Sequence, residues 1–399
     1  MNAGQPMKYD FDTVVDRSRN DSAKYREAVL HYGTNDVIPL WIADMDFRTA
    51  PRIVEALRER AEQGIFGYTY RPEAYWEALR GWNLRRNDHA FDTAHMAFAP
   101  GVVPAMRILL SRYTQPGDKV IIQQPVYHPF ADIVENTGRK LLVSPLRRLA
   151  DGRYEMDLED FEEQLRGGDV RIFLLCSPHN PVGRVWTREE LRAVGELCLR
   201  YGVRIFSDEI HSDLLLDGHR HCCTAAVSPE IAAITTTFMA PSKTFNLAGL
   251  QASTILFPDT AEKEDYVAEL KRMDIARNSS FSLVAAMTAY NDCADWVDEL
   301  CAYLAENMRF LRDFCAAELP ELRPNTPEAT YLNWVDCSGL GLGGNEEIVR
   351  FCVERAGIAP GRGADFGVGG EQFIRINAAC PRATLEQAFT RLRDAVRRR

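Results

Sequence analysis

Short apolar runs alternate with amphipathic segments through the middle of the chain. The apolar runs are rich in β-branched and aromatic residues, which is typical of buried strands in a mainly parallel sheet. They cover residues 120–122, 141–143, 171–175 and 203–206. Between the last two runs the pattern predicts a helix over 187–201, with a capping box formed by Thr187 and Glu190 and a stop at Gly202. Such a strand–helix–strand unit predicts an α/β fold.

The pattern changes towards the C-terminus. Strand-like runs continue through 232–238 and 251–257, and two long helical segments follow at 260–273 and 295–317. A new α/β stretch begins at Ala329. We therefore expect three parts: an N-terminal segment that packs with the small domain (1–48), a large domain (49–285) and a smaller C-terminal α/β domain (286–399).

Composition narrows the class of protein. The chain has 399 residues, of which 46% are hydrophobic and 26% charged, and its formal net charge is −10. These values are ordinary for a globular protein, whereas nucleic-acid binding requires a basic face. No apolar stretch reaches the ~18 residues that span a bilayer, the N-terminus shows no signal segment, and the ten cysteines lack CxxC spacing. We expect a cytoplasmic protein that binds neither nucleic acid nor membrane.

A lysine at the end of a predicted strand is the first candidate for chemistry. Lys243 lies in the segment 240–246, which follows an apolar run. A desolvated lysine has a lowered pKa, and its neutral amine can attack a carbonyl carbon. Ser242 beside it could donate a hydrogen bond to a phosphate. Taken alone, the segment is better explained as a loop with a surface lysine.

Two further candidates follow predicted strands. Asp208 comes after the strand 203–206, and ligands of open α/β sheets bind at the carboxyl ends of strands. A buried carboxylate needs a cationic partner, such as a protonated pyridine nitrogen; the alternative is an aspartate that caps the next turn. Asn180 lies in the loop 177–184, which contains two prolines and a glycine. Its amide could bind an oxygen on a ligand ring, or the loop could be a plain turn.

A weaker candidate is Gly101, which precedes a predicted helix over 104–113. Glycine permits close approach of the backbone, and exposed amides at a helix N-terminus bind phosphate readily. A glycine before a helix is common, so this feature supports a phosphate site only together with the other candidates.

The combination extends over nearly the whole chain. The runs that carry it are 39–47, 66–68, 125–127, 177–184, 207–213, 240–250 and 373–377. Together, and in this order, they resemble fold-type I pyridoxal-phosphate enzymes of the aminotransferase class I/II superfamily. More narrowly, the chain is similar to the MalY/PatB group of carbon–sulfur β-lyases. The resemblance implies a large cofactor-binding domain, with a mainly parallel sheet flanked by helices, and a smaller C-terminal α/β domain.

The resemblance also implies a role for each matching residue. Lys243 matches the lysine that forms a Schiff base with pyridoxal phosphate, and Lys243 and Tyr127 are the candidates for proton transfer. Asp208 matches the partner of the pyridine nitrogen. Arg375, with Asn180, matches the substrate site, where a planar guanidinium can clamp both oxygens of the α-carboxylate. The residues implied in cofactor binding are Gly101, Val102, Val103, Tyr127, Asn180, Asp208, His211, Ser242, Lys243 and Tyr68.

The implied cofactor contacts differ in kind. Tyr127 would stack on the cofactor ring, and Asn180 would contact the ring hydroxyl. Tyr68 would reach the phosphate from the neighbouring subunit, which implies a homodimer with shared active sites. The residues that match the phosphate cradle are Gly101, Val102, Val103 and Ser242.

The resemblance implies an activity with one close alternative. The implied reaction cleaves cystathionine or related L-cysteine S-conjugates to a thiol, pyruvate and ammonia. The alternative is an aminotransferase with a keto-acid acceptor, because both reactions begin with removal of the Cα proton. His211 favours lysis, since many aminotransferases of the superfamily carry a tyrosine there. Two departures from the family pattern are Ser177, where an asparagine is usual, and the segment 17–25, which matches only loosely.

Two other motifs have simpler explanations. Residues 339–344 fit G-x-G-x-x-G, but too little chain follows to complete a dinucleotide-binding fold, so we predict a turn of the small domain. Residues 219–223 crowd four potential zinc ligands into one loop without a second pair, so we predict an exposed loop and no metal site. A non-enzymatic regulatory role would be additional, since Lys243 and Asp208 are both present.

Overall fold

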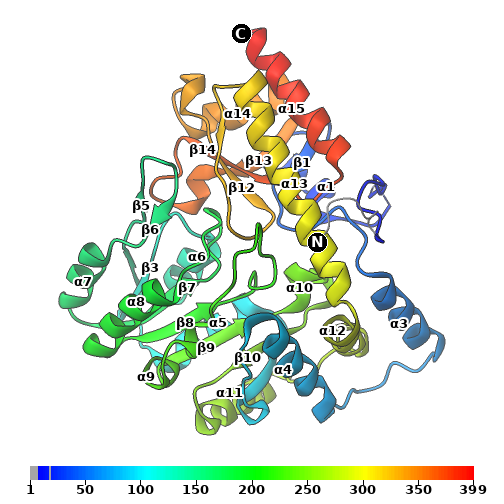
Figure 1. Ribbon diagram of the computed structural model, residues 1–399. Helices are drawn as coiled ribbons and strands as arrows, with labels where there is room; N and C mark the ends of the chain where they lie inside the picture. The colour runs from blue at the N-terminus through cyan, green and yellow to red at the C-terminus, as the bar shows by residue number, and fades with distance from the viewer. Residues whose placement is uncertain (1–7, 18) are drawn as a thin grey trace.

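The computed structural model describes residues 8–17 and 19–399. The fold is built on two sheets (Figure 1). The large sheet has seven strands in the order β2-β10-β9-β8-β7-β3-β4, and the small sheet has five strands in the order β1-β13-β14-β12-β11. The strands of the large sheet are β2 (Met96–Ala99), β3 (Lys119–Ile122), β4 (Lys140–Val143), β7 (Val170–Cys176), β8 (Arg204–Asp208), β9 (Thr235–Met239) and β10 (Ser253–Leu256). Those of the small sheet are β1 (Ile38–Leu40), β11 (Arg323–Pro324), β12 (Leu332–Asp336), β13 (Ile358–Arg362) and β14 (Phe373–Asn377).

The large sheet is mostly parallel, as predicted. Only β10 runs antiparallel to its neighbours, β2 and β9. All four strands first predicted from apolar runs are present, as β3, β4, β7 and β8. The next two, β9 and β10, are shorter than predicted. The short helix α9 (Pro229–Ala232) extends to the first residue of the run predicted at 232–238. Gln251, the first residue of the run predicted at 251–257, has φ of +53° and turns the chain before β10 begins.

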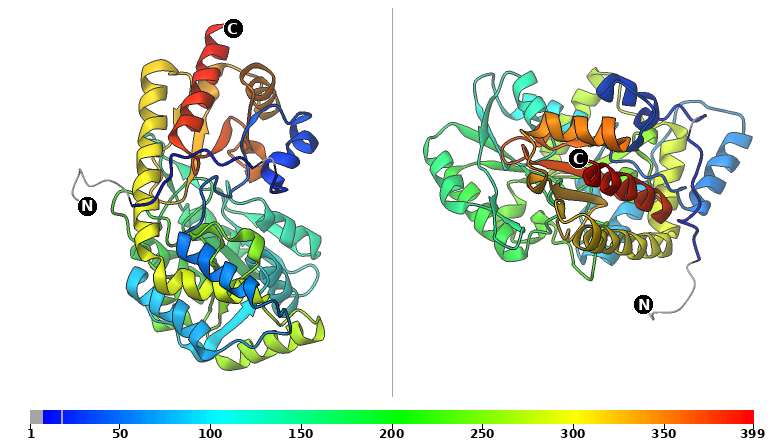
Figure 2. Two further views of the ribbon diagram at one scale, coloured as in Figure 1. Left: turned by 90° about the vertical axis from the view of Figure 1, so that its right-hand side faces the viewer. Right: turned by 90° about the horizontal axis from the view of Figure 1, so that it is seen from above.

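Helices cover both faces of the large sheet (Figures 1 and 2). The capping box of Thr187 and Glu190 is present at the start of α8, and Gly202 ends that helix with φ of +66°. The helix after Gly101 begins at Val102, two residues earlier than predicted, because a proline is tolerated in the first turn of a helix. The longer helices are α3 (Pro51–Glu62), α4 (Glu73–Asn87), α5 (Val102–Tyr113), α6 (Pro129–Asn136), α7 (Leu158–Arg166), α8 (Arg188–Tyr201), α11 (Thr260–Arg272), α12 (Ser280–Asp292), α13 (Ala294–Glu318), α14 (Asn345–Ala356) and α15 (Arg382–Arg397).

The remaining α-helices and strands are short. They are α1 (Ala23–Arg26), α2 (Ala28–Tyr32), α9 (Pro229–Ala232), α10 (Pro241–Thr244) and the hairpin of β5 (Arg147–Arg148) and β6 (Tyr154–Glu155). No helix in the described ranges has the length and apolarity needed to cross a membrane.

The N-terminal segment completes the small sheet. Its strand β1 pairs in parallel with β13, more than 300 residues away in the sequence. The predicted turn at 339–344 is present between β12 and α14, where Gly341 adopts φ of +61°. The long helix α13 runs beside α15, as Figure 2 shows. The domain limits at residues 48 and 285 stay predictions.

Alternation along the central strands separates two apolar clusters. Val120 and Ile122 pack into one cluster, whereas Ile121, between them, packs into the other. Because successive side chains of a strand point to opposite faces, each face of the sheet is covered by its own core. The carboxyl ends of β7 and β8 lie at the edge of the large sheet that faces the small sheet (Figure 1), where Cys176 and Asp208 are paired in register.

Candidate active site

One cavity of about 360 Å³ collects the predicted site residues. It is lined by ten of the eleven residues proposed from the sequence, from both sheets and the loops between them. They are Gly101, Val102, Val103, Tyr127, Asn180, Asp208, His211, Ser242, Lys243 and Arg375.

Lys243 presents its amine to this cavity from α10. Its Nζ atom donates a hydrogen bond of 2.7 Å to the carbonyl oxygen of Ala43. Desolvation, and then the positive charge of Arg375, lower the pKa of the amine to about 8. The amine is therefore closer to its neutral, nucleophilic form at physiological pH than an exposed lysine would be.

Asp208 is a buried carboxylate at the end of β8. Its side chain accepts a hydrogen bond of 3.2 Å from the amide of Ile210, so the turn-capping role considered above is present as well. No cation lies within ion-pair distance of it in residues 8–17 and 19–399. Burial raises the pKa of this carboxyl to about 7, and a cationic ligand group would remove that penalty.

Arg375 carries the opposite charge and is also unpaired. It lies in β14 and is 6% exposed. Its guanidinium donates to the amide oxygen of Asn180 at 3.3 Å and to the carbonyl of Trp41 at 2.5 Å, while Nε has no partner. Within the described chain it makes no ion pair with a carboxylate. A buried guanidinium without a counter-charge is a binding site for an anion.

The loop that carries Asn180 is fixed on several sides. A hairpin-like turn joins His179 to Arg184, and Gly183 closes it with φ of +72°, where a Cβ would lie 2.5 Å from Pro327. Arg184 then forms ion pairs of 2.9 Å with Glu190 and Glu328.

A second group of donors lies at the start of α5. Gly101 is the N-cap of this helix and offers no capping side chain. The first amides of the helix, including those of Val102 and Val103, therefore have no intrahelical acceptor, and the helix dipole favours an anion there. Ser242 lines the same cavity and adds a hydroxyl. The group is suited to a phosphate.

Two further side chains predicted from the sequence line the cavity, those of His211 and Tyr127. His211 is 3% exposed, and its Nδ1 atom has no hydrogen-bond partner. Burial lowers the pKa of His211 to about 3, so the ring is neutral. Burial also raises the pKa of Tyr127, which keeps its phenol protonated. Both offer polar atoms to a ligand, without a charge of their own.

Tyr68 lies outside the cavity. It is 96% exposed, in an extended segment between α3 and α4, and the guanidinium of Arg277 lies 5.6 Å from its ring centroid. Its predicted role requires a neighbouring copy of the chain and stays a prediction.

The prediction of an exposed loop at residues 219–223 is right for His219 and Arg220, which are exposed, and wrong for residues 221–223. His221 and Cys223 are buried, and Nε2 of His221 lies 2.8 Å from a carboxylate oxygen of Glu209. The buried carboxylate draws the histidine inward, because an unpartnered charge there would be costly. Donor atoms of these three residues lie within 4.8 Å of one another. The absence of a metal stays a prediction.

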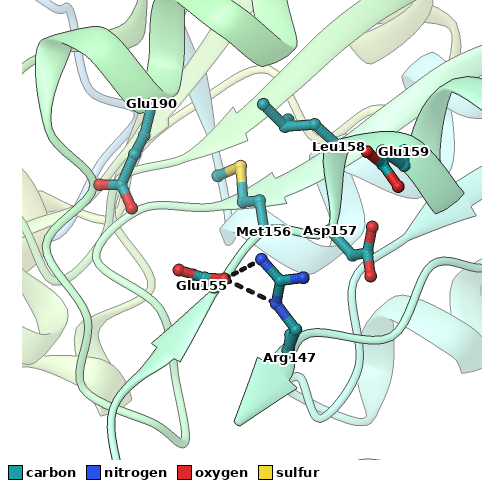
Figure 3. Close-up of a pocket in the computed structure, with 7 residues that line it drawn as sticks. All are labelled: Arg147, Glu155, Met156, Asp157, Leu158, Glu159 and Glu190. Atoms are coloured by element: carbon teal, nitrogen blue, oxygen red, sulfur yellow. Dashed lines mark hydrogen bonds and ion pairs between the residues drawn. The ribbon is translucent and has the colours of Figure 1, made fainter. Parts of the chain in front are cut away.

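A different cavity of about 320 Å³ lies beside the β5–β6 hairpin. Figure 3 shows Arg147 directed at Glu155, with which it forms an ion pair. Its other charged wall residues are Asp157, Glu159 and Glu190. None of the predicted site residues lines it, so it is not the candidate active site.

Sequence reasoning missed what the segment 41–47 does. Asp44 and Asp46 in this segment form ion pairs with Arg17, and Asp46 also pairs with the fully buried Lys24 at 2.8 Å. Arg17 and Lys24, from the loosely matching part of the sequence, therefore hold 41–47 in place. The residue types in 41–47 do not predict its contacts at the cavity, because Lys243, Tyr331 and Arg375 all bond to backbone carbonyls of this segment.

Comparisons with known proteins agree with this geometry. The model of the family aminotransferase class I and II matches residues 35–392. Cystathionine beta-lyase PatB of Bacillus subtilis is 41% identical over 97% of this chain and 100% of its own. The crystal structure of a pyridoxal-phosphate-bound protein from Clostridium difficile 630, named as an aminotransferase, superposes with a TM-score of 0.95 at 45% identity. The match covers 97% of this chain and 100% of that chain. The structure of cystalysin from Treponema denticola, which contains pyridoxal 5′-phosphate, superposes with a TM-score of 0.94 at 32% identity. The match covers 98% of this chain and 100% of that chain. The chain belongs to the aminotransferase class I and II family.

Proposed function

We propose that the protein is a pyridoxal-phosphate-dependent carbon–sulfur β-lyase. It cleaves cystathionine or related L-cysteine S-conjugates to a thiol, pyruvate and ammonia. One observation carries the proposal: a lysine amine, a carboxylate without a cation and an arginine without a carboxylate line the same cavity. The similarity to a cystathionine beta-lyase over nearly the full chain supports the choice of reaction.

The unsatisfied groups fit the cofactor. Asp208 would hold the proton on its pyridine nitrogen, and the neutral His211 and the amide of Asn180 would bind polar atoms on the ring. The first-turn amides of α5, with Ser242, would bind the phosphate. Lys243 would hold the cofactor covalently. When bound, pyridoxal phosphate supplies an electron sink for bonds cleaved at the substrate's Cα and Cβ.

The chain's own residues then handle the substrate and its protons. Arg375 binds the α-carboxylate through two parallel hydrogen bonds. The neutral amine of Lys243 accepts the Cα proton, for which its lowered pKa suits it. As the Cβ–S bond breaks, the departing sulfur takes a proton from Lys243 or from the phenol of Tyr127, which burial keeps protonated.

We also propose a homodimer in which Tyr68 serves the neighbouring active site. Figure 1 shows the connection between α3 and α4 at the outer edge of the molecule. Large apolar side chains are exposed along it, and contiguous exposed apolar surface is typical of an interface. They are Ile65 (76% exposed), Phe66 (58%), Tyr68 (96%) and Tyr70 (82%).

We further propose that the protein acts in the cytoplasm. All ten cysteines are free, which is typical of proteins in a reducing compartment.

The deciding experiment measures pyruvate released from L-cystathionine by the cofactor-loaded protein, without a keto acid. Steady release with equal ammonia is expected from the wild type. Lys243→Ala should reduce it by at least about 1,000-fold, since the base and the covalent link are both lost, while Lys271→Ala, an exposed lysine on α11, should not change it. Turnover only after a keto acid is added would make the protein an aminotransferase instead.

A further inference from the structure

The segment 41–47 receives hydrogen bonds from the small sheet along most of its length. Arg375 donates to the carbonyl of Trp41 at 2.5 Å. Asn377, two residues later in β14, donates to the carbonyls of Ile42 and Asp44 at 2.6 and 2.5 Å. The backbone next to the cavity is therefore fixed by side chains that belong to the small sheet.

The carbonyl of Ala43 differs from the others because donors from both sheets meet on it. The Lys243 amine, from the large-sheet side, donates to it at 2.7 Å. The hydroxyl of Tyr331, just before β12 in the small sheet, donates to it at 2.8 Å. A carbonyl oxygen has two lone pairs, so both hydrogen bonds can exist together.

Tyr331 keeps the proton that it donates to Ala43. It is 1% exposed, and burial raises the pKa of its phenol, so the hydroxyl keeps its proton. Its ring packs edge-on against His211, with centroids 6.0 Å apart and an interplanar angle of 77°. The direction of the hydroxyl is therefore held by packing on one side and by the Ala43 carbonyl on the other.

We propose that Tyr331 is a positioning residue for proton transfer: it holds the carbonyl of Ala43 as the acceptor that orients the free amine of Lys243. This inference rests on the proposed function. A neutral amine has one lone pair and two N–H bonds. Donating one N–H to a fixed carbonyl restricts where the lone pair points. Once the amine has taken the Cα proton, the same carbonyl binds the ammonium through a charge-assisted hydrogen bond.

Tyr331→Phe removes only the hydroxyl, and two rates test its effect. The first is exchange of the Cα proton of L-alanine for deuterium in D2O, followed by NMR with cofactor-loaded protein. Alanine has no leaving group, so this rate reports proton transfer whether lysis or transamination follows. The second is the rate at which the cofactor-free chain takes up pyridoxal phosphate covalently, followed by absorbance, which uses the same amine as a nucleophile.

The expected result is a loss of about tenfold in both rates, since one hydrogen bond no longer holds the acceptor. The apparent affinity for alanine should stay within twofold, because Arg375 is untouched. Tyr303→Phe is the matched control: that buried phenol bonds to Asp12 and to the amide of Arg382, outside the cavity, and both rates should match the wild type. Wild-type rates in Tyr331→Phe would overturn the proposal.

A second variant covers the case in which Tyr331→Phe does not fold. 3,5-Difluorotyrosine at position 331 keeps the ring and the hydroxyl but ionises more readily. Because an ionised phenol has no proton to donate, the variant should lose exchange at an alkaline pH at which the wild type still exchanges; identical pH profiles of the two proteins would contradict the proposal. If the wild type exchanges alanine but releases no pyruvate from L-cystathionine, the lyase assignment fails while the role of Tyr331 is still tested.

Discussion

The guanidinium of Arg375 donates a hydrogen bond of 3.3 Å to the amide oxygen of Asn180. Arg375 lies in a strand of the small sheet and Asn180 in a loop that follows a strand of the large sheet, 195 positions away in the sequence. This contact places the anion-binding group of the small sheet beside a loop of the large sheet. Any change in how the two sheets pack therefore moves the proposed carboxylate site relative to the proposed cofactor site.

Arg375→Lys tests the carboxylate site. A lysine keeps the charge but loses the two parallel donors, so KM for L-cystathionine should rise about 10- to 100-fold with little change in kcat, as expected when a hydrogen bond to a charged group is lost. Steady-state pyruvate release measures this. Arg139→Lys is the control, because the half-buried guanidinium of Arg139 donates hydrogen bonds to Thr114, outside the cavity; it should leave KM unchanged. An unchanged KM in Arg375→Lys would remove Arg375 from the substrate site.

The pH dependence of cofactor uptake tests the state of Lys243. Only the neutral amine attacks the cofactor aldehyde. Because the pKa of Lys243 is lowered from 10.5 to about 8, the uptake rate of the cofactor-free chain should rise with pH and reach half its maximum near pH 8. Stopped-flow absorbance between pH 6 and 10.5 measures the profile. A rate that is still rising steeply above pH 10 would mean that the amine is not desolvated.

Asp208→Asn tests the burial of the carboxylate through stability. The folded pKa of Asp208, about 7, lies above its ordinary value of 3.8. The stabilisation from the protonated carboxyl is therefore fully present below pH 3.8 and is lost as the pH rises through 7. In the cofactor-free chain, the variant should gain unfolding free energy relative to the wild type between pH 4 and 8, by up to about 4 kcal/mol.

Urea unfolding at several pH values measures this difference. The exposed Asp274 provides a control substitution, Asp274→Asn, which should follow the wild type. With cofactor present the order should reverse, because the variant cannot ionise to pair with the pyridine nitrogen. A difference between Asp208→Asn and wild type that does not change with pH would show that Asp208 is not a desolvated acid.

Mixed dimers test the proposed role of Tyr68. Lys243→Ala and Tyr68→Ala should each be strongly impaired alone. If Tyr68 serves the neighbouring site, unfolding and refolding the two variants together produces dimers with one intact site, and about a quarter of wild-type pyruvate release should return in an equal mixture, since half of the dimers are then mixed. If Tyr68 serves its own subunit, no mixed dimer has an intact site and activity should stay at the level of the variants.

The sequence by itself determined six of the seven strands of the large sheet, all except β2, and most of the cavity wall. Buried strands are continuous apolar runs, and a capping box and a terminal glycine limit the helix between two of them, so these elements follow from local pattern. Asp208 and Asn180 follow parallel strands, whose carboxyl ends meet at one edge. Local order was therefore enough to bring their side chains together.

Only the tertiary structure decided the contacts that control the chemistry. The Ala43 carbonyl and Lys243 are 200 positions apart, and a backbone carbonyl is the same in every residue, so no residue type marks it. Burial of His221 depends on Glu209, a buried carboxylate 12 positions away, which loop composition did not reveal. The lowered pKa of Lys243 and the raised pKa of Asp208 arise from desolvation, a property of how the two sheets pack around the cavity rather than of any segment.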